Sequence, residues 1–214
     1  MKGRCPIFYR IPLSLRLVVT FVLPSILVSP LAASARVIRV PDDYASIQEA
    51  IRAATNGDTV SVGPGVYAEV VSITKSLTLE RGSIENVIIQ GSVYGSAPDI
   101  TIEGFTIRGA LTGIALSQAD RSVVKDCHIG PITGGWNDPP NQTGQSVLAI
   151  RLTNSQDCRI ENNTLIDLRA GSGAPAPPPD HTGPGGNGGA AIGLYLNDVE
   201  NCQITNNRIR TCLL

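Results

Sequence analysis

The stretch that decides the fold runs from Cys158 to Leu165 and reads CRIENNTL. The same pattern recurs in the 214-residue chain at residues 100–107, 122–129 and 202–209, where it reads ITIEGFTI, SVVKDCHI and CQITNNRI. The successive offsets between these segments are 22, 36 and 44 residues. Periods of this size are typical of repeat architectures. We infer a base period of 22 residues, with 14 and 22 extra residues inserted in the two longer units.

The repeated units have the alternating pattern of short strands. Equivalent apolar positions lie along all four units, and one of them holds Ile102, Val124, Ile160 and Ile204. A helical repeat would need apolar residues at a 3.6-residue period, which these units lack. A unit of this size cannot bury its inward face alone, but coils stacked about 4.8 Å apart join these faces into one core. The sequence therefore predicts an all-β parallel β-helix, a solenoid.

Three further positions of the repeat have defined expectations. The turn position holds Asp126, Asn162 and Asn206, residue types that tolerate left-handed backbone angles. The outward position holds Glu103, Lys125 and Glu161, which predicts attraction between charges on neighbouring coils. Cys158 and Cys202 share an inward position, where we expect unpaired thiols, because side chains in register suit disulfide geometry poorly. A bridge between them is the alternative.

The amino-terminal part of the repeat region differs. Residues 46–49 read SIQE, a capping box, and apolar residues at helical spacing follow until Asn56-Gly57. We expect residues 36–57 to form a cap with a short helix that covers the exposed end of the solenoid. Residues 58–214 are then the β-helix repeats, apparently truncated at the C-terminus.

The first 35 residues resemble a secretory signal peptide. Four basic residues and no acid precede an uncharged stretch that ends at Ala33-Ser34-Ala35, an A-x-A cleavage site. An uncleaved membrane anchor is the alternative. If the segment is a cleaved signal peptide, the protein contacts the membrane only through this segment, before cleavage. Without residues 1–35 the chain has 13 Lys and Arg against 18 Asp and Glu, a net charge of −5. This charge argues against nucleic-acid binding, and the expected location is extracytoplasmic: secreted, periplasmic or cell-surface.

Two insertions rich in Pro and Gly, residues 131–144 and 170–189, interrupt the repeats. Each follows the same strand of its unit, so both should leave one edge of the solenoid on consecutive coils. The residues expected to converge there and bind a sugar are Trp136, Asn137, Asp138, Asp180 and His181, since indole rings stack on sugars and carboxylates bond to them. Two loops without a ligand are the alternative. No metal site or cofactor is evident, and Ca²⁺ between Asp138 and Asp180 is only a secondary expectation.

The chain resembles the parallel β-helix repeat proteins of the pectin-lyase-like superfamily. The resemblance rests on VPDDYASIQEAI at 40–51, NGDTV at 56–60, GPGVY at 63–67 and SLTL at 76–79. The Asn162-Asn163-Thr164 and Asn206-Asn207-Arg208 turns resemble the repeats of this superfamily, including those of NosD-like periplasmic proteins. The resemblance covers about residues 37–210 and implies a right-handed coil.

The same scaffold carries lyases, hydrolases, esterases, epimerases and non-catalytic proteins, so the resemblance implies no single activity. No catalytic motif of these relatives can be placed on this sequence. The sequence favours an exported protein that binds or processes a polysaccharide; an enzyme of this kind would be a polysaccharide lyase or glycoside hydrolase. A non-catalytic scaffold at a surface, in adhesion or in the periplasm is the alternative.

Overall fold

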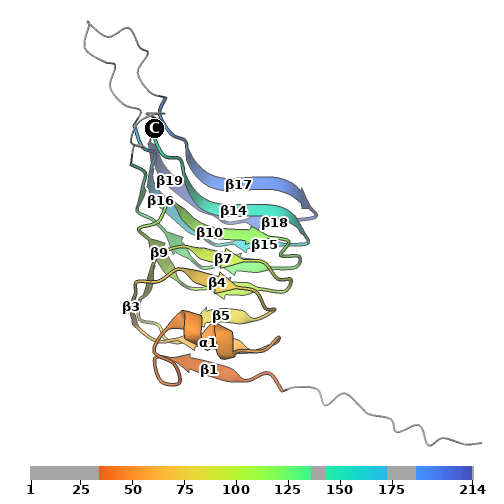
Figure 1. The fold of residues 1–214 in the computed structure, drawn as a ribbon. Helices are drawn as coiled ribbons and strands as arrows, with labels where there is room; N and C mark the ends of the chain where they lie inside the picture. The colour runs from red at the N-terminus through yellow and green to blue at the C-terminus, as the bar shows by residue number, and fades with distance from the viewer. Residues whose placement is uncertain (1–33, 136–142, 173–186, 214) are drawn as a thin grey trace, which may run out of the picture. The chain divides into compact units, whose positions relative to one another are not determined.

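The computed structural model describes residues 34–135, 143–172 and 187–213, and these residues form three parallel β-sheets that the chain visits in turn (Figure 1). Sheet A consists of β1 (Val37–Val40), β2 (Thr59–Val62), β5 (Thr78–Arg81), β8 (Thr101–Glu103), β11 (Val123–Lys125), β15 (Arg159–Glu161) and β18 (Gln203–Thr205). Sheet B consists of β3 (Gly65–Tyr67), β6 (Val87–Gln90), β9 (Thr106–Arg108), β12 (His128–Ile129), β13 (Ile132–Thr133), β16 (Thr164–Arg169) and β19 (Arg208–Leu213). Sheet C consists of β4 (Val71–Ile73), β7 (Val93–Gly95), β10 (Thr112–Ser117), β14 (Val147–Gln156) and β17 (Ala191–Glu200). The predicted parallel β-helix is confirmed.

The strand register follows the period inferred from the sequence. In sheet A, Ile102 pairs with Val124, Val124 with Ile160, and Ile160 with Ile204. Among the strands after residue 58 that the sequence did not predict are β3, β7 and β13, the last within the insertion of residues 131–144. These strands are two or three residues long and lie outside the four aligned segments, so no alternation revealed them.

The core consists of aliphatic ladders that run through the inside of the coils. Ile102, Val124 and Ile160 are buried, as are most of the inward residues of all three sheets. Their equivalents in the last described coil are more exposed, and Ile204 keeps 41% of its surface in solvent. The reason is that within the described residues no further coil covers this layer.

The corner between sheets A and B has the left-handed geometry expected of its residue types. Asp126, Asn162 and Asn206 have φ angles of 55°, 57° and 56°. The residue after each of these points inward. Asn163 in this inward position is fully buried, and its carboxamide bonds to the neighbouring coils on both sides. Asn side chains of successive coils thus bond to each other, and these bonds come from the second Asn of each pair.

The amino-terminal segment contains a strand as well as the expected helix. Strand β1 pairs with β2 and begins sheet A, whereas the sequence predicted only a cap with a helix over residues 36–57. The helix α1 (Ile47–Ala53) begins after Ser46, whose hydroxyl accepts a hydrogen bond from the Glu49 amide at 3.2 Å. The carboxylate of Glu69, on the next coil, accepts from the Ile47 and Gln48 amides at 2.9 Å. These bonds satisfy the free N–H groups of the helix start.

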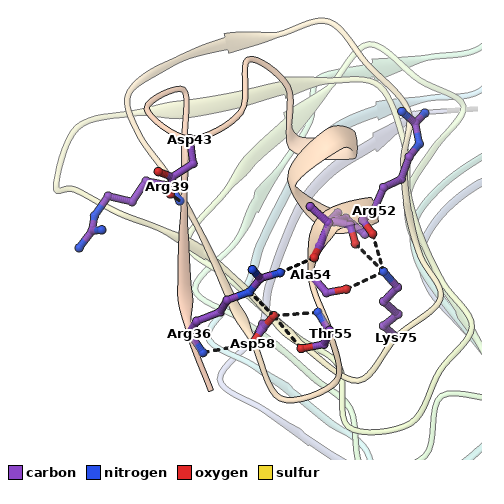
Figure 2. Close-up of polar contacts among 10 residues, drawn as sticks. Arg36, Arg39, Asp43, Arg52, Ala54, Thr55, Asp58 and Lys75 are labelled. Atoms are coloured by element: carbon purple, nitrogen blue, oxygen red, sulfur yellow. Dashed lines mark hydrogen bonds and ion pairs between the residues drawn. The ribbon is translucent and has the colours of Figure 1, made fainter. Parts of the chain in front are cut away.

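The other end of α1 is held by two cations, as Figure 2 shows. Lys75 donates from Nζ to the carbonyl oxygens of Ile51, Arg52 and Ala54 at 3.2, 2.7 and 2.6 Å. The Arg36 guanidinium donates to the carbonyl oxygen of Ala53. Cations near a helix C-terminus are favourable because the last carbonyl groups lack partners within the helix.

None of the described helices is long and apolar enough to cross a membrane. The segment 1–35, expected to be a signal peptide, lies outside the described residues up to residue 33.

Candidate functional site

Both insertions leave the solenoid at the corner between sheets B and C, as expected from the offsets. The first, residues 131–144, follows β12, contains β13 and precedes β14, and the second follows β16 and precedes β17. Backbone hydrogen bonds join their bases: Gln145 donates to Gly135 at 2.8 Å, Gly171 to Gln145 at 2.8 Å, and Gly189 to Gly171 at 2.9 Å. The two insertions therefore begin and end side by side on consecutive coils.

Glycine makes this close crossing possible. A Cβ atom on Gly144 would overlap the carbonyl oxygen of Gly171, and one on Gly171 would overlap that of Gly135. Gly189 is similarly close to the backbone of Gln145. These glycines are needed because backbone segments of neighbouring coils touch directly, which leaves no room for a side chain.

The five residues predicted to bind a sugar, Trp136, Asn137, Asp138, Asp180 and His181, all lie outside the described residues. Their convergence, and the Ca²⁺ expectation for Asp138 and Asp180, stay predictions. What the structure describes next to them is the outer face of sheet C, whose longest strands, β14 and β17, start where the two insertions end.

One ladder of outward residues crosses all five strands of sheet C. Its members are paired from strand to strand in the register Ser72, Tyr94, Ala115, Arg151 and Tyr195. Tyr94 and Tyr195 expose 43% and 39% of their surfaces. Figure 1 shows the strands β4, β7, β10, β14 and β17 stacked one above another along this face. At the usual strand spacing, the two tyrosines are about 14 Å apart.

The face is hollowed beside Tyr94. A cavity of about 270 Å³ is lined there by polar, small and apolar groups of four strands. Among its lining residues are Ser72, Tyr94, Ser117, Arg151 and Thr153. The small side chain of Ala115, between Tyr94 and Arg151 in the ladder, leaves the space open. Arg151 is exposed, and its guanidinium has no hydrogen bond or ion pair within the described part of the chain.

These groups can recognise a polar ligand that has flat apolar surfaces. Tyrosine offers a ring face for stacking and a hydroxyl that donates or accepts. Arg151 offers five N–H donors in a fixed plane. Ser72, Ser117 and Thr153 line the same cavity, and the Thr153 hydroxyl donates to the Leu116 carbonyl at 3.5 Å. Sugars have both hydroxyl groups and C–H faces, so an oligosaccharide matches this set of groups.

Sequence reasoning missed this ladder, although the alignment of repeats contained the signal. Ile114, Ile150 and Leu194 occupy one equivalent inward position of the repeat, and Leu116, Leu152 and Leu196 occupy another. The residue between each pair must point outward. Those residues are Ala115, Arg151 and Tyr195, the last three members of the ladder.

A second cavity lies at the corner between sheets C and A. It is lined by residues of three successive coils, among them Asp120, Gln156, Asp198 and Glu200. Asp120 accepts a hydrogen bond from the Gln156 amide at 3.0 Å, and Asp198 has a φ angle of 51°. Asp120 thus bonds to the backbone of the next coil, and Asp198 lies within β17. Within the described ranges, no group of three or more His, Cys, Asp or Glu residues is arranged to hold a metal ion.

The other reactive or charged side chains of the repeat have the following surroundings. His128 points outward from sheet B, is half-buried, and pairs with Thr106 and Thr164 on the neighbouring strands. Cys158 is buried, Cys202 is half-buried, and both are free thiols, as predicted. Glu103 and Lys125 form the expected ion pair between coils, with 2.9 Å between Oε2 and Nζ.

Comparison with known proteins gives a family and one distant relative. A family model described as "Right handed beta helix region" matches residues 59–213. A cell surface glycoprotein of Methanothermus fervidus is 30% identical over 112 residues, which are 49% of this chain and 19% of that protein. The chain thus spans about a fifth of the length of that relative. No solved structure matches significantly.

Proposed function

Since this chain belongs to the right-handed β-helix family, we propose that it is an exported, cell-surface protein that binds a polysaccharide on the outer face of sheet C. The observation that carries this proposal is the ladder from Ser72 to Tyr195, with two exposed tyrosines and an exposed arginine beside a cavity. Tyrosine presents an apolar ring face together with a hydroxyl group, a combination that suits recognition of a polar ligand.

Binding without hydrolysis fits this face best. Hydrolysis of a glycosidic bond generally needs two carboxyl groups that flank the bond. The ladder holds Ser, Tyr, Ala, Arg and Tyr, and among the described residues no carboxyl group lines the cavity beside it. A stack of rings and N–H donors can instead align a sugar chain across the strands, as a non-catalytic binding surface would.

Three observations support export. The A-x-A site ends at Ala35, and Ser34 and Ala35 are exposed. Arg36 is the first residue held by the fold, through a bond from its backbone N to Asp58 Oδ1 at 3.0 Å. Among the described residues, cleavage after Ala35 would thus remove only the exposed Ser34 and Ala35. In addition, the distant relative is named as a cell surface protein.

The test is a calorimetric titration of the purified mature protein with a panel of neutral and acidic oligosaccharides. Tyr94→Ala and Tyr195→Ala should each weaken binding at least several-fold, because each removes a stacking surface. Val66→Ala is the matched control, since Val66 is an exposed outward residue of sheet B, and it should leave binding unchanged.

Trp136→Ala forms a separate arm of this titration, because Trp136 belongs to the set predicted from the sequence. Loss of binding in Trp136→Ala together with normal binding in both tyrosine variants would move the site from sheet C to the insertions. A folded wild-type protein that binds no glycan in the panel would favour the scaffold alternative. Amino-terminal sequencing tests export, and the expected first residue is Arg36.

A further inference from the structure

We propose that Asn162 is a site of N-linked glycosylation, an inference that rests on the proposed export. Asn162-Asn163-Thr164 is an Asn-x-Thr tripeptide in which the middle residue is not proline, the pattern that N-glycosylation requires. The chain contains this pattern once more, at residues 141–143, but Asn141 lies outside the described residues. The proposal therefore concerns Asn162.

The structure places Asn162 where a glycan can be accommodated. Asn162 is exposed and has a φ angle of 57° at the corner between sheets A and B. Its backbone N–H donates to the carbonyl of Thr205 at 3.1 Å, whereas its carboxamide has no partner within the described part of the chain. A glycan on Nδ2 would thus break no hydrogen bond of the described fold.

The position also leaves the proposed binding face uncovered. The solenoid has three sheets, and the corner between sheets A and B is the one corner that sheet C does not border. A glycan on Asn162 and a ligand on the Tyr94 to Tyr195 ladder would therefore occupy different sides of the coil. The two proposals are compatible and can be tested independently.

The fold determines when a glycan could be transferred to Asn162. Asn163 is fully buried and bonded to both neighbouring coils, and Thr164 belongs to β16, which pairs with β12 and β19. A transferase that needs an accessible tripeptide would have to act before this coil closes, during translocation. In the step, Nδ2 of Asn162 bonds to the anomeric carbon of a polyprenyl-phosphate-linked glycan. The bond from that carbon to the phosphate oxygen breaks, the lipid phosphate leaves, and Nδ2 loses a proton.

The chain offers an internal control one coil further. Asn206 has the same turn position, a φ angle of 56° and an exposed side chain, and Asn207 follows it as Asn163 follows Asn162. The two tripeptides differ at their third residue, which is Thr164 after Asn162 and Arg208 after Asn206. These two residues are paired in the register of β16 and β19. Recognition of the tripeptide therefore predicts a glycan on Asn162 and none on Asn206, although the two have the same place in the repeat.

The experiment is intact glycopeptide mass spectrometry on the full chain purified from its native cells, with the amino terminus sequenced in parallel. Thr164→Val should abolish the glycan on Asn162, because it keeps the branched shape and removes the hydroxyl, and Thr164→Ser should retain it. Arg208→Thr should create a new glycan on Asn206. If Thr164→Val fails to accumulate, Asn162→Gly gives the same readout at a position that already has a positive φ.

The outcomes separate the two proposals. An unmodified Asn162 in a chain that begins at Arg36 overturns the glycosylation site and leaves export standing. A glycan on this peptide that persists in Asn162→Gly, or one on wild-type Asn206, overturns it as well. A chain that keeps Met1 and stays in the cytoplasm overturns the proposed export and the glycosylation site together.

Discussion

Nδ2 of Asn163 donates a hydrogen bond to Oδ1 of Asn207, which is 3.0 Å away on the next coil. The same Oδ1 also accepts from the backbone N–H of Asn163 at 2.9 Å, and Nδ2 of Asn207 donates back to the carbonyl of Ile160. Asn163 in turn accepts from the Cys127 amide at 3.0 Å and donates to the Val124 carbonyl at 2.9 Å. Asn163 and Asn207 thus each satisfy backbone groups of the preceding coil that the tight corner leaves without partners.

Replacing Asn163 by Leu should lower the free energy of unfolding by roughly 2–4 kcal/mol, because the buried Cys127 amide and Val124 carbonyl would lose their partners. Urea denaturation measures the change. Asn162→Gly is the matched control at the adjacent exposed position and should shift stability by less than about 0.5 kcal/mol. Equal losses in the two variants would show that the bonds of Asn163 are not what stabilises the corner.

Replacing Ile160 by Asp should abolish cooperative folding. Ile160 is buried between Val124 and Ile204 in sheet A, so an Asp there would be an unpaired buried charge. Arg159→Gln, at the adjacent outward position, should change stability by under about 0.5 kcal/mol. Circular dichroism during thermal unfolding compares the two, and similar midpoints would contradict the inward and outward assignment.

Replacing Gly171 by Ala should disturb the crossing of the two insertions, because the new Cβ would overlap the Gly135 carbonyl oxygen. A loss of at least about 1–3 kcal/mol is expected from such overpacking. Gly188→Ala provides the comparison, since the nearest atom to its Cβ would be the Gly171 carbonyl oxygen at 3.9 Å. Hydrogen exchange of the amides of Gln145 and Gly189 should accelerate only in the Gly171 variant.

Stability should fall in acid through Asp58. The backbone N–H of Thr55, followed by the bonds from Arg36, holds the pKa of this carboxyl well below its ordinary value of 3.8, against the opposing effect of burial. Because the folded pKa is depressed, the stabilisation is complete above the ordinary pKa and is lost progressively as the pH falls below it. Asp58→Asn should cost roughly 2–3 kcal/mol at neutral pH.

A pH series of denaturation midpoints checks this assignment. The wild type should lose stability between about pH 4 and pH 2, and Asp58→Asn should lose less over the same range. If the variant and the wild type have parallel pH profiles, Asp58 does not cause the acid sensitivity. Asp43→Asn, at an exposed carboxylate that accepts from the Arg39 amide, serves as the control.

Alkylation should distinguish Cys127, Cys158 and Cys202 from one another. Burial raises the pKa of Cys127 to about 12 and that of Cys158 to about 11, and alkylating agents react with the thiolate. In the folded protein at pH 8, Cys202 should therefore react before Cys127 and Cys158, because it is half-buried. Peptide mass spectrometry after short labelling gives the order. A cross-linked peptide that joins Cys158 and Cys202 would contradict the unpaired state.

Much of the scaffold could be predicted because each coil repeats a local rule. The alternation around Ile102 and Ile160, the Asn and Asp corners and the capping box at Ser46 are encoded within a few residues. Strand β1 escaped prediction because its partner, β2, follows only after the intervening helix. The strands β3 and β7 escaped because they lie outside the four aligned segments, and three residues by themselves give too little alternation to recognise.

The sequence by itself determined the period, the inward and outward residues and the corner where the insertions leave, because these depend on spacing along one chain. Only the tertiary structure decided which outward residues become neighbours. Tyr94 and Arg151 lie on one face because Ala115 pairs with both, and the insertion of residues 131–144 hides this in the linear order. The cap formed by Lys75, Glu69 and Asp58 likewise depends on stacking, since side chains of one coil meet the backbone of another only after both have closed.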